Sequence, residues 1–184
     1  MRRIALLIAL AAIANFALRS EDSASRLTAD GPQDNVADNV RRVPPPGITI
    51  PETDRTELFE TAVALQKEID DLGKALKGKP ALLELLPDVQ IFANAVRYAL
   101  KYDEFYALGE VPVARKLLAQ GFERAKNLRD GKAPWTTETG LVVRGYKSKI
   151  DDSIQPYGLV VPASYKPGTP FQHRLDIWFL GRGE

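Results

Sequence analysis

The feature that most constrains the fold of this chain is a change of hydrophobic period near residue 140. Before it, apolar residues recur every three or four positions, which is the spacing of a buried stripe on an α-helix. After it, β-branched and aromatic residues follow one another in short runs between turn residues, as in β-strands. We therefore expect an α+β chain, with a helical region followed by strands.

The first helix is expected to begin near Asp54. Thr53 or Asp54 is placed to cap it, and Glu57 is placed to complete a capping box. Gly78 and Pro80 are expected to end it. Its buried stripe is predicted to contain Leu58, Ala62, Leu65, Ile69, Leu72 and Leu76.

Two more helices are expected, over about 88–102 and 111–129. A short turn at 82–86 precedes the first of them, and Asp88 is placed to cap it. Gly131 is a suitable stop for the second. Their predicted buried residues are Ile91, Phe92, Ala95, Val96, Ala99 and Leu100 on one helix, and Val113, Leu117, Leu118, Phe122, Ala125 and Leu128 on the other.

Residues 140–162 predict a β-hairpin, with strands over 140–150 and 153–162 around an Asp-Asp turn. Pro156 has no N–H to donate to a ladder, so that end of the second strand should be an edge or a bulge. A third strand is expected over 174–180. Its apolar residues occupy both faces, which predicts a central strand covered on both sides.

The amino terminus has the pattern of a secretory signal peptide. Arg2 and Arg3 precede an apolar run over 4–13, and Ala12 and Ala14 are the small residues of a cleavage site. We therefore expect export, to the periplasm or the extracellular space. The run is short for a membrane span, which needs about 20 residues, so no stable span is expected after cleavage.

The expected domain organisation has four parts. A signal peptide over 1–14 precedes a disordered or extended linker over 15–52, whose Pro-Pro-Pro-Gly sequence favours polyproline II. A helical region follows over 53–131. An incomplete β portion of a larger domain is expected over 132–184.

Composition excludes several classes of function. The net charge is +1, and no Lys/Arg cluster lies beside an aromatic platform, so no nucleic-acid partner is expected. The chain has no cysteine, which rules out disulfides, thiol nucleophiles and cysteine-bound zinc. We expect no cofactor and no metal.

Most candidate catalytic residues have a simpler structural explanation. The one histidine, His173, lies three residues before Asp176 on a predicted strand, so the two should point to opposite faces. No Gly-x-Ser-x-Gly motif occurs, and Ser148 and Ser153 are placed to cap the hairpin turn. The adjacent carboxylates 70–71, 103–104 and 151–152 are expected to be solvated, and Trp135 and Trp178 are expected in the core or a seam.

One pattern retains a catalytic interpretation. Gly181, Arg182 and Gly183 follow the predicted third strand, and glycines there let backbone N–H groups face a developing oxyanion. These three residues are the oxyanion-loop candidates. No catalytic nucleophile or base is identified in the chain.

About half of the chain, residues 88–184, resembles a group of secreted bacterial serine hydrolases, the prolyl-oligopeptidase-like α/β-hydrolases. Gln-Pro-Tyr-Gly at 155–158 and Gly-Arg-Gly-Glu at 181–184 are the most specific matches. The family commonly has His-Gly before Arg-Gly, whereas this chain has Leu180, so only backbone donors would remain in the loop. Further matching segments are 98–100, 104–106, 131–135, 143–151, 159–162 and 174–180.

The resemblance implies a layout in which the helices precede a hydrolase domain. The hairpin would supply the first antiparallel strands of its sheet, 174–180 the next strand, and 181–184 an oxyanion-hole N–H. The nucleophile, the acid and the triad histidine would lie further on. The leading interpretation is thus the N-terminal portion of an exported serine hydrolase, inactive alone, whose parent hydrolyses a small ester or a peptide. The alternative is a complete, secreted, non-catalytic binding or interaction module.

Overall fold

A computed structural model of the chain describes residues 46–168 and 174–178. The predicted signal peptide and the predicted linker up to residue 45 lie outside the described residues. The described part is α+β, with three long helices followed by a two-stranded antiparallel hairpin, which confirms the predicted class. In chain order its elements are α2 (Glu52–Ala75), α3 (Pro80–Leu83), α4 (Pro87–Lys101), α5 (Glu110–Arg129), the 3-10 turn η3 (Pro134–Thr136), β1 (Gly140–Lys147) and β2 (Ile154–Val161).

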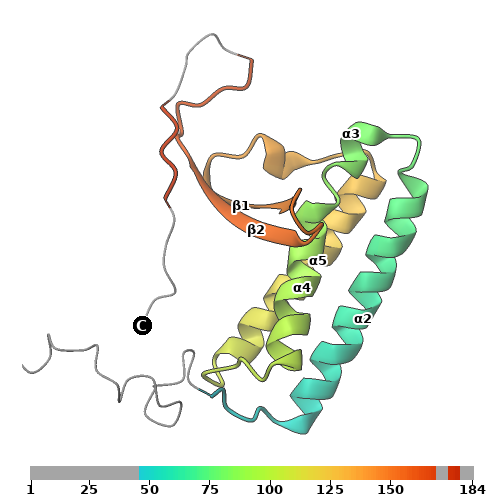
Figure 1. Ribbon diagram of the computed structural model, residues 1–184, viewed down its shortest axis with the longest axis vertical. Coiled ribbons are helices and arrows are strands. Elements are labelled where there is room, and N and C mark those ends of the chain that lie inside the picture. Colours follow the sequence, from blue (N-terminus) through green and yellow to red (C-terminus); the bar gives the residue numbers. More distant parts are fainter. Residues whose placement is uncertain (1–45, 169–173, 179–184) are drawn as a thin grey trace, which may run out of the picture. The chain divides into compact units, whose positions relative to one another are not determined.

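The helices α2, α4 and α5 pack against one another, and the hairpin lies against α4 (Figure 1). Every residue of the predicted stripe on α2 is buried, and Leu58, Leu65 and Leu72 are at most 1% exposed. Full burial of one such side chain contributes about 1.5–3 kcal/mol. The regular spacing of these leucines therefore accounts for both the helix and its orientation.

Glycine lets the three helices approach closely at Gly121. A Cβ there would lie 2.5 Å from Leu65 Cδ2 of α2 and 3.0 Å from Phe92 Cβ of α4. Because α5 contacts two helices at once, its buried face includes small residues that a search for large apolar ones passes over. Val113, predicted to be buried, is 53% exposed, while Ala114 is buried in its place. Ala95 of α4 is likewise exposed, against the prediction.

The predicted helix caps are wrong. The helix α2 begins after Pro51 with no side-chain cap, although Thr53 and Asp54 were expected to supply one. Asp54 and Glu57 instead bind Arg115 of α5, with Nη2–O distances of 2.5 and 2.6 Å. The hydrogen bond from Arg115 lowers the pKa of Glu57. Because α2 begins at Glu52, Thr53 and Asp54 lie inside its first turn and not at the cap position.

The hairpin follows the prediction. Its strands pair from Gly140 opposite Val161 to Lys147 opposite Ile154, and Pro156 lies opposite Gly145. Ser148 N–H donates to the carbonyl oxygen of Ser153 at 2.8 Å, beyond the strand ends. Bonded and non-bonded pairs alternate in an antiparallel ladder, so Gly145 and Pro156 form a non-bonded pair. The missing N–H of Pro156 therefore faces the outer edge of β2, as expected for an edge position.

The predicted third strand is not formed over its described part. Residues 174–178 have no regular secondary structure. Leu175, Ile177 and Trp178 are 76%, 68% and 84% exposed, so neither face of this segment is covered by the described residues. Trp178 was expected in the core or a seam, and that expectation is wrong. An apolar run can form a central strand only where pairing partners exist on both sides.

The segment just before α2 packs on the described region. Ile50 is 3% exposed, and Ile48 N–H donates to the carbonyl oxygen of Phe105 at 2.6 Å. A Cβ on Gly47 would lie 1.8 Å from the carbonyl oxygen of Asp103. Glycine is therefore required at this close approach of two backbones.

Candidate functional site

Asp88 is the buried charged side chain of the described region. It is the second residue of α4 and is 1% exposed. The sequence predicted that it caps the helix, but α4 has no side-chain cap. Burying an ionised carboxylate is costly unless hydrogen bonds and an opposite charge compensate for it. Its partners therefore decide what this site does.

Three distant residues supply those partners, and we call the group with Asp88 the Asp88 clasp. Gly145 N–H donates to Oδ1 at 2.6 Å, and Trp135 Nε1–H donates to Oδ2 at 2.8 Å. Arg144 Nε lies 3.0 and 2.9 Å from the two oxygens. The Arg144 side chain is 18% exposed, so this ion pair is largely shielded from water. The clasp joins α4 to η3 and to β1.

The ladder register explains why Gly145 can take part. Gly145 is in a non-bonded pair, so its N–H points away from β2 and toward α4. A Cβ on Gly145 would lie 2.3 Å from the carbonyl oxygen of Pro87. Only glycine lets the strand approach the amino end of α4 this closely. Arg144 is required for charge and Gly145 for space.

Arg124 of α5 lies beside the clasp. Its guanidinium carbon is 4.9 Å from the ring centroid of Phe92 and 4.8 Å from that of Trp135, and its Nη1 donates to the carbonyl oxygen of Asp88 at 3.1 Å. Burial lowers the pKa of Arg124, and the carboxylates of Asp88 and Glu138 oppose that shift. Arginine remains charged in proteins, so a fixed cation is held between two rings.

A cavity of about 260 Å³ opens next to Arg124. We call it the edge slot. One wall is the exposed side of α5, one is the amino-terminal half of β1, and the base contains the rings that stack on Arg124. Its lining residues are Phe92, Gln120, Glu123, Arg124, Asn127, Pro134, Trp135, Glu138, Leu141, Val142 and Val143.

The clasp holds parts of the fold together and is not arranged for catalysis. Both oxygens of Asp88 accept short hydrogen bonds, so the carboxylate is not positioned to remove a proton from a substrate. The chain's one histidine, His173, lies outside the described residues. Over 46–168 and 174–178, no three His, Cys, Asp or Glu side chains come together as a metal site would require.

The oxyanion-loop candidates Gly181, Arg182 and Gly183 also lie outside the described residues, so they stay predictions. Ser148 and Ser153 have the structural role expected of them. Ser148 Oγ accepts a hydrogen bond from the N–H of Ile150 at 3.2 Å, and Ser153 Oγ lies 2.7 Å from Asp151 Oδ1. The serine hydroxyls of the hairpin turn are thus engaged within the turn.

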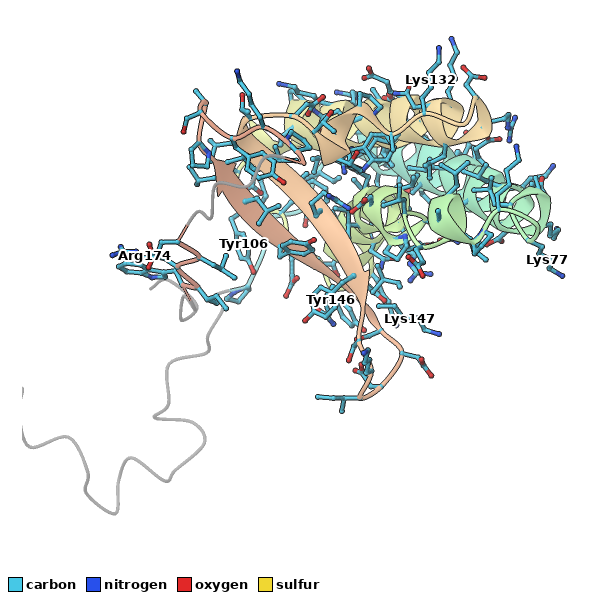
Figure 2. The ribbon with its side chains drawn as sticks, turned by 90° about the horizontal axis from the view of Figure 1, so that it is seen from above. Lys77, Tyr106, Lys132, Tyr146, Lys147 and Arg174 are labelled. Atoms are coloured by element: carbon cyan, nitrogen blue, oxygen red, sulfur yellow. The ribbon has the colours of Figure 1, made fainter. Side chains whose placement is uncertain are left out.

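The hairpin exposes apolar side chains next to this rigid attachment. Leu141 and Val160 lie opposite each other and are 89% and 79% exposed. Tyr146 and Tyr157 pack edge to face, with ring centroids 5.9 Å apart, and both are partly exposed. Figure 2 shows Tyr146 and Lys147 at the end of β1, next to the hairpin turn.

Sequence reasoning found Trp135 as a core residue but missed its partners. A signal was present, since Arg144 is a charged residue inside a β-branched run and Asp88 stands next to buried Val89. Each position alone has an ordinary explanation, as an exposed strand residue or as a helix cap. Only their juxtaposition shows that the two charges neutralise each other.

Searches of known proteins add no relative. No protein-family model, no curated protein and no solved structure matches the chain. In the part of the chain that the structure describes, no helix has the length and apolar character needed to cross a membrane.

Proposed function

We propose that this chain is the supporting N-terminal portion of an exported serine-hydrolase-like protein. In this proposal, the helices and the Asp88 clasp hold the hairpin as the start of a larger sheet. The parent protein would hydrolyse a small ester or a peptide through an acyl-enzyme. The present chain would contribute structure, and the oxyanion loop 181–183 would contribute backbone donors.

The observation that carries this proposal is the contrast between the two sides of the hairpin. β1 is fixed to α4 by a buried, charge-assisted network. β2 has an outer edge with no pairing strand among the described residues, and the exposed Leu141–Val160 pair lies on the same two strands. An open strand edge presents unpaired N–H and C=O groups, and exposed apolar side chains lose contact with water when another segment covers them. Both features favour pairing of this hairpin with further chain.

Two measurements test the proposal. The purified chain should not be labelled by a fluorophosphonate probe, because the proposal places the nucleophile elsewhere. The gene read onward from the codon for Glu184 should encode a Gly-x-Ser-x-Gly motif, and the longer product should be labelled at that serine. Stoichiometric labelling of the present chain, or a continuation without such a serine, would refute the proposal.

A second candidate function is a non-catalytic binding module. The edge slot favours it, because the slot combines backbone groups, a fixed arginine and exposed carboxylates. A module of this kind should unfold in one cooperative transition, with circular dichroism and the fluorescence of Trp135, recorded in a Trp178→Phe background, changing together.

A further inference from the structure

We propose that the edge slot binds an extended, lysine-containing peptide segment that pairs with the outer edge of β1. The backbone of β1 would supply hydrogen bonds, and the carboxylates around the slot would select the basic side chain. This proposal does not depend on a hydrolase parent.

The first support is the direction of the backbone groups on β1. The bond from Ser148 to Ser153 fixes the alternation of the ladder, so Leu141, Val143 and Gly145 are all in non-bonded pairs. Their N–H and C=O groups therefore face away from β2. The N–H of Gly145 is used by Asp88. Over 46–168 and 174–178, no backbone hydrogen bond from outside the ladder reaches Leu141 or Val143.

The second support is that this open edge lines a cavity that faces a helix. Leu141 and Val143 line the edge slot, and Gln120 and Asn127 of α5 line it from the other side. A strand edge next to a helix is the arrangement in which extended peptides add to a sheet, with backbone bonds for affinity and neighbouring side chains for specificity. The clasp fixes β1 next to this wall, so little ordering is needed on binding.

The third support is the charge around the slot. Glu123 and Glu138 are exposed, and neither forms an ion pair within the described part of the chain. The guanidinium of Arg124 donates to the carbonyl oxygen of Asp88 and lies against two rings, and its charge also acts on Glu138 and Glu123. Two exposed carboxylates thus face one partly buried cation, which leaves negative charge for a ligand. This favours a lysine side chain over a glutamate.

The outer edge of β2 is less suited to a short peptide. Pro156 has no N–H and interrupts the outward N–H groups between Ile154 and Gly158, although Gly158 and Val160 stay open to further chain. Proline at such a position also shows that the hairpin keeps its ladder when an outward N–H is absent. That tolerance provides a clean variant for the test.

The test measures binding of three fluorescein-labelled peptides by anisotropy at low ionic strength. The first is Ser-Val-Lys-Val-Ser, the second has glutamate in place of lysine, and the third is the lysine peptide with alternate backbone nitrogens methylated. We expect the lysine peptide to bind at least several-fold more tightly than the other two, because one lacks the charge and the other the N–H groups.

Two variants connect this binding to the slot. Val143→Pro removes one outward N–H and is expected to weaken the lysine peptide about five- to tenfold, the value of one hydrogen bond. Val160→Pro makes the same change on the opposite edge and should leave binding unchanged. Glu138→Lys should reverse the preference toward the glutamate peptide, which also tests the proposal should Val143→Pro fail to fold.

Several results would overturn the proposal. They are no binding of the lysine peptide, equal binding of the methylated peptide, or equal loss in the two proline variants. Sedimentation of the protein alone tests whether a second copy of the chain occupies the edge of β1. A dimer that Val143→Pro abolishes would mean that a second copy, and not a basic peptide, takes the edge.

Discussion

The Asp88 clasp leads to a specific prediction for Asp88→Asn. The substitution keeps the size and shape of the side chain but removes the negative charge opposite Arg144. It also turns one acceptor into an N–H₂ group that faces either Trp135 Nε1–H or the N–H of Gly145. The new N–H₂ group then faces another N–H donor, and no water can separate them because residue 88 is only 1% exposed.

The magnitude follows from burial. Removing one partner of a buried ion pair leaves the other charge uncompensated, which typically costs about 3–5 kcal/mol. Leaving one buried donor without an acceptor costs about 1–3 kcal/mol, and the two costs overlap because they involve one carboxylate. We expect the free energy of unfolding to fall by about 4 kcal/mol, a large share of the roughly 5–15 kcal/mol of a typical domain.

Urea unfolding followed by far-UV circular dichroism measures this loss, with a midpoint that moves and a slope that does not. Asp71→Asn is the matched control, because Asp71 pairs with Lys74 on the exposed side of α2 and should change the midpoint little. Arg144→Met in the Asp88→Asn background should recover part of the loss, since it removes the unpaired cation. A midpoint for Asp88→Asn equal to that of the control would refute the reasoning.

Three further predictions concern glycines and the hairpin turn. Gly145→Ala should lower the free energy of unfolding by about 3 kcal/mol, because its Cβ would lie 2.3 Å from a backbone oxygen at the start of α4. The low-field amide proton shift expected for the short hydrogen bond from Gly145 N–H to Asp88 should be lost as well. Gly121→Ala should lower the free energy of unfolding by about 1–2 kcal/mol, because crowding against α2 outweighs the gain in helix propensity; Gly78→Ala, with no neighbour within 4 Å, should have little effect in the same urea assay. Ser153→Ala should raise the pKa of Asp151 toward its ordinary value, because hydrogen bonds from Ser153 lower it. Because the pKa is lowered in the folded state, the charged carboxylate stabilises the turn above its ordinary pKa, and this stabilisation is lost as pH falls through the folded-state pKa. A carboxyl NMR titration should give a higher pKa for Asp151 in the variant, and an unchanged Asp151 titration would contradict this.

The elements with a strong local pattern were predictable. The stripe of α2 runs from Leu58 to Leu76 without interruption, so its helix and its buried face follow from spacing alone. The hairpin follows from two β-branched runs separated by an Asp-Asp turn. In both cases, residues close in sequence carry the information.

Elements that depend on their neighbours were predicted less well. The buried face of α5 is set by contact with both α2 and α4, which is why Gly121 and not Val113 is buried. Residues 174–178 have the composition of a strand but no partner strand within the described region. The composition of a segment indicates that it can form a strand, but the strand forms only where another strand is available to pair with it.

The amino-acid sequence by itself determined the helices, the hairpin and the burial of Trp135, because periodicity and turn residues act over a few positions. Only the tertiary structure decided what Asp88 does. Its three partners lie 47, 56 and 57 residues away along the chain, and no local pattern joins them to it. A carboxylate at the start of a helix is a cap when water surrounds it. Here burial removes the water, so the carboxylate takes its hydrogen bonds and its opposite charge from β1 and η3.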